Sequence, residues 1–330
     1  MSRFTACVLA SLAFVSGSVF AAYPDRPIKL IVPWGAGGDT DVIYRAFQPF
    51  FQKHLGGTIV IANIGGASGT KGAKEAKASP ADGYTIFAVH DSIHSTYWTG
   101  VADVDYTDFE PICLVSATPS ILTASPKAPW KDVKALVADA KKRPGQITVA
   151  TAGVTSAGHN AMDFIVKATG VKYKEVSYDG GNPAVVATVS GEADLTTQLA
   201  VEEADMIRGK RLRPLATVSD KPLELEGYGV IPPLSDFVPG FTAPANYFGI
   251  FIPKGVPDEV IKTLEKIWAE QIVKSDALKK YATSRGALFN PLYGEAAQKA
   301  VFPAIQANAW VLFEGGKAKV KPDTVGIPKP

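Results

Sequence analysis

Short apolar runs alternate with amphipathic stretches along most of the chain. The apolar runs are rich in β-branched residues and predict strands, whereas apolar residues three and four positions apart predict helices. The predicted strands are 28–32, 58–62, 84–89, 147–151, 173–178, 195–199, 214–218 and 248–252. The predicted helices are 42–55, 69–78, 130–142, 160–168 and a long helix that opens at Pro257. Strands that alternate with helices are typical of an α/β fold with parallel sheets.

One supersecondary unit occurs twice, as a strand, a glycine-containing loop and a helix. The first loop is Gly35–Asp41 and the second is Ala152–His159. Glycine lets a backbone approach a ligand closely, and the free N–H groups at a helix start favour an anion. A single loop of this kind is explained by a tight turn. Two in matching positions predict that one small anion is held between two lobes.

The first residues predict a secretory signal peptide. Arg3 precedes an apolar stretch from Phe4 to Val15, and Val19-Phe20-Ala21 provides a small-residue cleavage site. The apolar stretch is too short to span a membrane, which needs about 20 residues. We therefore expect residues 1–21 to be removed, with Ala22 as an alternative end, and the mature protein to be exported to the periplasm in soluble form.

Length and composition further limit the class of protein. A chain of 330 residues exceeds what one core usually supports, so two lobes are expected, 22–124 with 245–330 as lobe 1 and 125–244 as lobe 2. The predicted hinges lie near Ser125 and Ala243. With 34 basic and 32 acidic residues and no basic run, the sequence gives no reason to expect nucleic-acid binding. Cys113 is the one cysteine left after cleavage, and we expect a buried, unreactive thiol.

Catalytic and metal sites fit the sequence poorly, and no cofactor is predicted. Gly38 is followed by Asp39, where a phosphate-binding loop needs lysine and then serine or threonine. Ser156 and His159 could act in a secreted hydrolase, which an acidic residue against His159 would support. His90 and His94 have metal-like spacing, but the residues between them, 91–93, are expected to leave a strand, not to form a helix.

Several motifs in order resemble one family. They are Tyr23–Pro33, Gly37-Gly38 with Asp41, Asn63–Thr70, Ala81–Thr85, Lys142–Gly145, Gly153–His159, Gly180–Ala184, Gly191–Asp194 and Leu215-Ala216. This series is similar to the Bug-type extracytoplasmic receptors, which are solute-binding proteins of tripartite tricarboxylate transporters. The resemblance implies a two-lobed periplasmic-binding-protein fold, the Venus flytrap, with a hinge between the lobes. It also implies that a carboxylate is held by the two strand–loop–helix units, partly through ordered water, and passed to a membrane permease.

Carried onto this chain, the resemblance and the two loops predict a set of ligand-binding residues. They are Trp34, Gly37, Gly38, Thr40, Asp41, Ser92, Thr155, Ser156, His159, Tyr178, Gly180 and Gly181. Asp41 is also expected to pair with Arg45, four residues later on the same helix. Neither loop contains an arginine that could bind a carboxylate in a bidentate manner.

The nature of the ligand is left open by the sequence. A dicarboxylate is the leading expectation, with its carbon chain resting on Trp34, Tyr97 or Trp98, and Tyr178. These aromatic residues equally suit an aromatic carboxylate, or they pack between the lobes. A ligand-presenting partner of a sensor kinase would have the same fold, so the sequence does not separate it from a transport receptor.

Overall fold

A six-stranded sheet organises the first half of the structure. The computed structural model describes residues 23–104 and 106–330, so the predicted signal peptide, 1–21, lies outside it. The strand order is β13-β4-β12-β3-β1-β2. The parallel strands are β1 Ile28–Val32, β2 Ile59–Asn63 and β3 Thr85–His90, and the antiparallel ones are β4 Phe109–Thr118, β12 Asn246–Pro253 and β13 Leu292–Tyr293. We call the part of the chain built on this sheet lobe 1.

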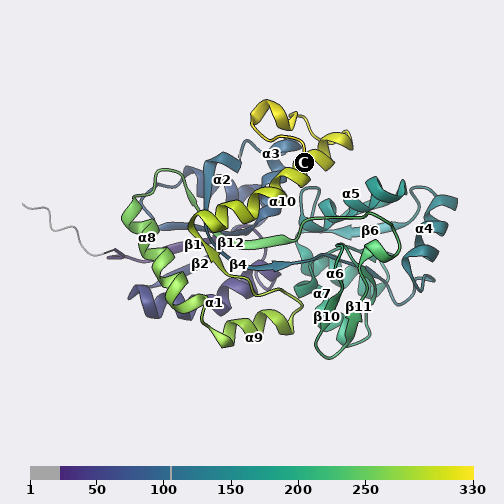
Figure 1. Ribbon diagram of the computed structural model, residues 1–330, viewed down its shortest axis with the longest axis horizontal. Helices are drawn as coiled ribbons and strands as arrows, with labels where there is room; N and C mark the ends of the chain where they lie inside the picture. The colour runs from purple at the N-terminus through teal and green to yellow at the C-terminus, as the bar shows by residue number, and fades with distance from the viewer. Residues whose placement is uncertain (1–22, 105) are drawn as a thin grey trace, which may run out of the picture.

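Helices cover both faces of this sheet, as Figure 1 shows. They are α1 Asp39–Leu55, α2 Thr70–Ala78, α3 Ser95–Trp98, α8 Asp258–Ile267, α9 Asp276–Ser284 and α10 Gly294–Glu314, with a π-helical turn Trp268–Ile272 after α8. Adjacent residues of β1 point to opposite faces. Leu30 packs in the cluster of α1 and α8, and Ile31 packs in the cluster of α2 and α10. Burial on both faces explains why β1 is apolar throughout. Cys113 of β4 is buried here, as predicted.

Trp268 is the centre of the cluster between α1 and α8. Its side chain is fully buried, it stacks on Phe47 at 6.0 Å between ring centroids, and its indole N–H donates to the Leu114 carbonyl at 3.1 Å. We expect Trp268→Ala to lower the free energy of unfolding by about 3–5 kcal/mol, because it leaves a large cavity. Urea denaturation measures this loss. The control is Val230→Ala at an exposed position, which should change stability by no more than about 0.5 kcal/mol; a similar loss for both variants would contradict the expectation.

The second half of the structure, lobe 2, has its own five-stranded sheet in the order β7-β6-β8-β5-β9. Its strands are β5 Ile121–Ala124, β6 Thr148–Thr151, β7 Lys174–Ser177, β8 Leu195–Thr196 and β9 Arg213–Thr217. Its helices are α4 Val133–Lys142, α5 Ala157–Thr169, α6 Gly181–Ser190 and α7 Ala200–Arg208, and a small hairpin pairs β10 Leu223–Leu225 with β11 Gly229–Ile231. The predicted two-lobed α/β fold is confirmed.

The chain crosses between the lobes after β4 and again before β12. The first crossing lies at Pro119-Ser120, between a strand of the first sheet and a strand of the second. The predicted boundary, 124/125, comes after β5 and assigns that strand to lobe 1, whereas β5 pairs with β8 and β9 of lobe 2. Proline followed by serine at 119–120 is typical of a turn between two apolar runs, and this was the available signal for the crossing. The predicted hinge at Ala243 lies three residues before β12.

The C-terminal part of the chain returns to lobe 2. In Figure 1, α10 crosses lobe 1 and ends near α5. The segment that follows it, predicted to wrap the surface, includes the 3₁₀ turn Pro322–Val325. Across residues 23–104 and 106–330, no helix combines the length and the apolar character that a membrane span requires.

Candidate functional site

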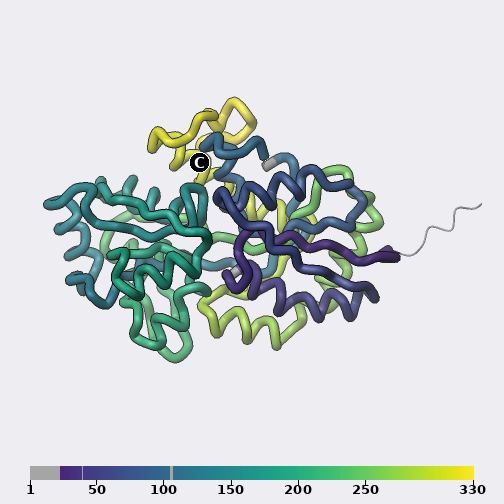
Figure 2. Tube along the Cα trace, turned by 180° about the vertical axis from the view of Figure 1, so that it is seen from behind, coloured from purple at the N-terminus to yellow at the C-terminus, as the bar shows by residue number. Residues whose placement is uncertain are grey.

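A small cavity of about 90 Å³ lies between the two lobes. In Figure 2 the purple loop that leads into α1 lies between the lobes, next to this cavity. Lobe 1 lines it with Trp34, Gly35, Ala36, Gly38, Thr40 and His90, and lobe 2 lines it with Ala152, Ser156, Ala157, Asp179, Gly180, Gly181, Asn182, Pro183, Gln198, Leu199 and Glu202. Its volume is far below the roughly 300–1,000 Å³ of sites for drug-sized molecules, so a ligand of a few carbon atoms suits it.

Four helices begin at this cavity. The residues that precede their first turns are Gly38 for α1, Ser156 for α5, Gly180 for α6 and Leu199 for α7, and all four line the cavity. This convergence follows from the topology, because β1 and β6 each end at the cleft and pass through a short loop into a helix. Each helix start carries a partial positive charge and free N–H groups. The cavity is therefore suited to an anion.

Half of the predicted ligand-binding residues line the cavity, namely Trp34, Gly38, Thr40, Ser156, Gly180 and Gly181. The others, Gly37, Asp41, Ser92, Thr155, His159 and Tyr178, are not among its lining residues. Their assignment as ligand-binding residues stays a prediction, and the structure gives most of them other contacts.

Gly37 and Asp41 hold the first loop in shape. The Asp41 carboxylate accepts hydrogen bonds from the Gly37 N–H at 2.8 Å and from the Asn63 amide at 3.0 Å, and it pairs with Arg45 at 2.9 Å. The predicted Asp41–Arg45 pair is thus confirmed. Burial alone would raise the pKa of Asp41, but the bonds from Arg45, Gly37 and Asn63 lower it below its usual value. The Gly37 carbonyl accepts from the Asn182 amide of lobe 2 at 2.6 Å, which joins the lobes beside the cavity.

Ser92 lies behind the cavity in a 3₁₀ helix, Asp91–His94. The expectation that residues 91–93 leave a strand without forming a helix is therefore wrong. Asp91 explains the turn, because its carboxylate accepts from the Tyr247 backbone N–H of β12 at 2.6 Å. Ser92 is fully buried, and its hydroxyl is 2.5 Å from Nδ1 of His90.

His90 does line the cavity, which sequence reasoning missed. Its ring stacks on Trp34 with 4.4 Å between centroids and 9° between planes. Burial, helped by the nearby His94, lowers the pKa of His90 to about 3, so the ring is neutral at physiological pH. Among the described residues, no group of three or more histidine, cysteine or acidic side chains is placed to hold a metal.

Trp34 is the single aromatic residue of the predicted four that lines the cavity. Trp98 is fully buried in the core of lobe 1, where Tyr97 packs edge-on against it at 5.0 Å. Tyr178 donates from its hydroxyl to Glu192 at 2.8 Å on the outside of lobe 2. The aromatic content that suggested an aromatic ligand is thus largely used in packing.

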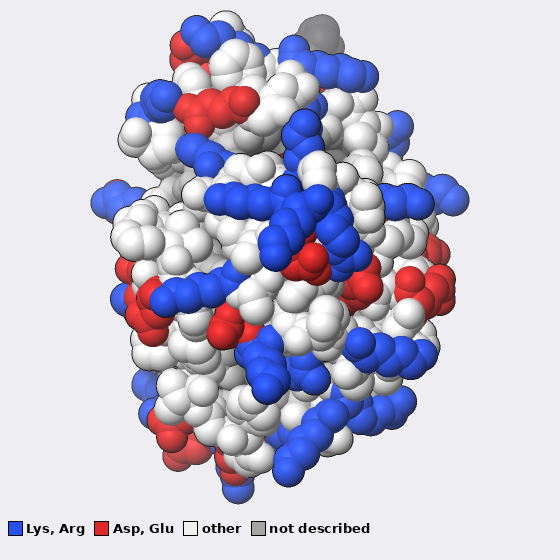
Figure 3. Space-filling view, turned by 90° about the vertical axis from the view of Figure 1, so that its right-hand side faces the viewer, with Lys and Arg blue, Asp and Glu red and all other residues white. Residues whose placement is uncertain are grey.

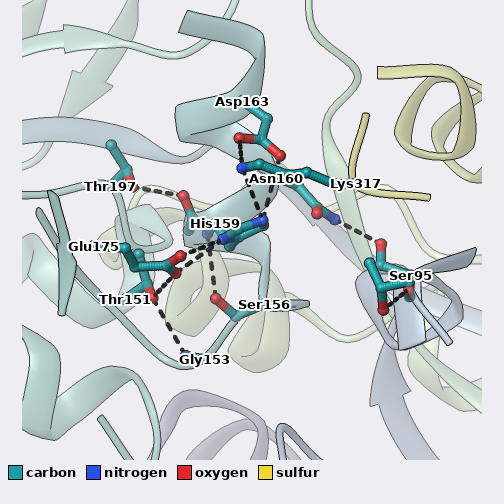
Figure 4. A network of polar contacts seen from close by, with 12 residues as sticks. Ser95, Thr151, Gly153, Ser156, His159, Asn160, Asp163, Glu175, Thr197 and Lys317 are labelled. Carbon is teal, nitrogen blue, oxygen red and sulfur yellow. Dashed lines mark hydrogen bonds and ion pairs between the residues drawn. The ribbon is translucent and has the colours of Figure 1, made fainter. Parts of the chain in front are cut away.

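Ser156 and His159 do not form a catalytic pair. The Ser156 hydroxyl caps α5 by accepting the His159 backbone N–H at 3.2 Å, while the ring turns toward two carboxylates (Figure 4). Nδ1 lies 2.9 Å from Glu175, and Nε2 lies 3.3 Å from Asp163. The acidic residue that would support a hydrolase is present, but both ring nitrogens are engaged, which leaves none to accept a proton from Ser156.

His159 belongs to an ion network that joins the lobes behind the cavity. Lys317, which follows α10 of lobe 1, pairs with Asp163 of α5 in lobe 2. Figure 4 shows a second link nearby, from the Asn160 amide to the Ser95 hydroxyl at 2.9 Å. Burial lowers the pKa of His159, but hydrogen bonds and charge from Asp163 and Glu175 outweigh it and raise the pKa above its usual value.

Sequence reasoning also missed the acidic wall of the cavity. Glu202 lies in the first turn of α7, a helix that was not predicted, and it accepts from the Leu199 N–H at 3.2 Å. The Gln198 side-chain amide makes two hydrogen bonds when its nitrogen donates to Glu202 at 3.1 Å and its oxygen accepts from the Ala152 N–H at 3.0 Å. The sequence after Leu199 is Ala-Val-Glu-Glu, and acidic residues at this spacing are typical of the first turn of a helix. This was the available signal for α7.

Comparison with known proteins identifies one group of relatives. Residues 43–312 match the profile of the tripartite tricarboxylate transporter family receptor. BugT of Bordetella pertussis is 30% identical over 91% of this chain and 92% of its own length. The structure of the periplasmic binding protein BugD has a TM-score of 0.80 at 28% identity, and covers 90% of this chain and 99% of its own. The structure of R. palustris Rpa4515 with adipate has a TM-score of 0.79 at 27% identity, and covers 89% and 98%.

Proposed function

Because this chain belongs to the tripartite tricarboxylate transporter receptor family, we propose that it captures a small aliphatic carboxylate, with a dicarboxylate as the leading class, in the cavity between its lobes. The chain is a Bug-type solute-binding receptor and not an enzyme. The observation that carries the ligand class is the convergence of four helix starts on one cavity shared by both lobes. The related structure with adipate supports a dicarboxylate.

One carboxylate of the ligand would bind at the starts of α1 and α5. Backbone N–H groups after Gly38 and the hydroxyls of Thr40 and Ser156 are available donors at the cavity wall. Hydrogen bonds to a charged acceptor contribute about 1.5–3 kcal/mol each, so a few suffice for micromolar binding, which corresponds to about −8 kcal/mol. Trp34, stacked on His90, would support the carbon chain.

Lobe closure would couple binding to recognition by a partner. A ligand that contacts both lobes stabilises the closed arrangement, whereas a ligand that contacts one lobe leaves the equilibrium unchanged. Two hydrogen bonds already join the lobes, one from the Asn182 amide of α6 to the Gly37 carbonyl and one from the Asn160 amide of α5 to the Ser95 hydroxyl. Exported to the periplasm after loss of residues 1–21, the receptor would present its ligand to a permease of a tripartite tricarboxylate transporter; a sensor kinase is the alternative partner.

The test is a thermal-shift screen of mature protein that has been unfolded and refolded to remove any bound compound. The panel contains aliphatic di- and tricarboxylates, amino acids and aromatic acids. A ligand at 100 times its dissociation constant stabilises the folded state by about 2.7 kcal/mol, which raises the melting temperature measurably. A shift with aliphatic carboxylates supports the proposal. A shift with aromatic acids alone contradicts the aliphatic class, and no shift with any compound contradicts carboxylate capture.

A further inference from the structure

The cavity that suits an anion also has an acidic wall. Of its lining residues, two carry carboxyl groups, Glu202 and Asp179, and none is a lysine or an arginine. The basic side chains lie elsewhere, and Figure 3 shows many of them on the outer face of lobe 2, where α4 exposes Lys134, Lys141 and Lys142. A plain dicarboxylate would therefore bring two negative charges to a cavity with no positive side chain.

Glu202 is held in place facing this cavity. Its Oε2 accepts both the Leu199 N–H at 3.2 Å and the Gln198 side-chain nitrogen at 3.1 Å. Its Oε1 lies beside Gly181, where a Cβ atom would come within 1.8 Å of it. Among the described residues, Glu202 has no ion-pair partner, so Oε1 is available to a donor from the ligand.

We propose that the ligand carries a protonated amino group as well as its carboxylate, and that Glu202 binds this amino group. This inference rests on the proposed function and narrows it. The helix starts of α1 and α5 would hold the carboxylate, and Oε1 of Glu202 would accept an N–H of the ammonium group. A charge-assisted hydrogen bond of this kind offsets the burial of both charges, whereas ionised Glu202 would repel a plain carboxylate.

The ionisation of the groups around Glu202 agrees with this role. Burial raises the pKa of Glu202 to about 7, against the Leu199 hydrogen bond that lowers it. His90, which lines the same cavity, is neutral because burial lowers its pKa to about 3, and burial raises the pKa of Glu203, the next residue of α7, well above its usual value. Asp179 is the remaining carboxyl group of the cavity and is exposed. An ammonium ion favours ionised Glu202, so its binding should weaken as the pH falls through 7.

The experiment compares matched ligands by isothermal titration calorimetry. The probes are succinate, malate and aspartate, with glutarate and glutamate as a longer pair. The expected result is at least ~10-fold tighter binding of the amino compound than of its unsubstituted partner. Glu202→Gln keeps the shape of the side chain and should abolish this preference. Glu203→Gln, one residue along on α7 and outside the cavity lining, should keep it.

A pH series gives an independent readout. From pH 8 to pH 6 the ionised fraction of Glu202 falls, so the amino ligand should bind roughly 10-fold more weakly to the natural protein and about equally to Glu202→Gln. If succinate or malate binds as tightly as aspartate, the inference is wrong while carboxylate capture stands. If no carboxylate of any class binds, the proposed function fails and the inference fails with it.

Discussion

Replacing His159 with leucine is expected to lower the free energy of unfolding by about 3–5 kcal/mol, because it leaves the buried Asp163 and the partly buried Glu175 without their partner. The ring lies between Glu175 and Asp163, and Lys317 would be the one remaining cation of the network. Urea denaturation at pH 6 measures the loss. His159→Leu combined with Glu175→Gln should recover part of it, since the glutamine carries no charge. His54→Leu at the end of α1, a half-buried histidine, is the control and should change stability by no more than about 0.5 kcal/mol.

The contribution of this network to the free energy of unfolding should decrease both at low pH and at high pH. Burial, complete for Asp163 and partial for Glu175, would raise the pKa of each, but His159 lowers it, so their contribution to stability is lost as the pH falls through these lowered values. His159 has a raised pKa, so its contribution is lost as the pH rises through that value. The full effect is expected from about pH 4.5 to 6.5, the ordinary pKa values of glutamate and histidine. An equal difference between the natural protein and His159→Leu from pH 4 to 9 would contradict this account.

Gly153→Ala is expected to weaken ligand binding by about 10- to 100-fold, because it opposes closure of the lobes. Gly153 precedes α5 in lobe 2, and a Cβ atom there would lie 2.4 Å from the Ser68 hydroxyl of lobe 1. Titration of the protein with a carboxylate identified in the screen measures the affinity, and small-angle scattering measures whether the ligand still makes the protein more compact.

A matched variant separates this clash from backbone strain. Gly145 also has a positive φ and also flanks β6, but a Cβ atom there would have no neighbour within 4 Å. Gly145→Ala should therefore lower the free energy of unfolding without changing the affinity for the ligand. Gly153→Ala combined with Ser68→Gly should recover binding, because Ser68 already has a positive φ of 55° that glycine adopts freely. Equal affinity loss in the two single alanine variants would show that strain, not the interlobe contact, is responsible.

The sequence predicted the parts of the site that depend on local order. Gly38 and Ser156 were found because each stands between a buried strand and a helix, and this order alone brings a helix start to the end of a parallel strand. Ser92 and His159 stand next to those segments, but their side chains turn into the lobes. The direction a side chain takes depends on Asp91, Glu175 and Lys317, which are distant in sequence.

The fold was predicted best where one pattern covered a whole element. β4 was missed because it contains Pro111 and pairs with β12 through two shifts of register, so its residues do not alternate regularly. β8 lies within the predicted strand 195–199 but ends at Thr196, and no helix was predicted after it, so α7 and the position of Glu202 were missed. Glu202 was therefore absent from the predicted site.

The convergence of helix starts on one cavity has a consequence for how such receptors diverge. A main-chain N–H donor is not removed when a side chain is replaced. Changes in sequence can therefore leave the carboxylate-binding groups intact. Selection can then change a few side chains of the cavity lining, such as Gln198 and Glu202, and alter which ligand binds while the main-chain donors stay in place. Relatives that share about 30% of their residues with this chain can thus keep the main-chain contacts to a carboxylate while their side chains select a different ligand.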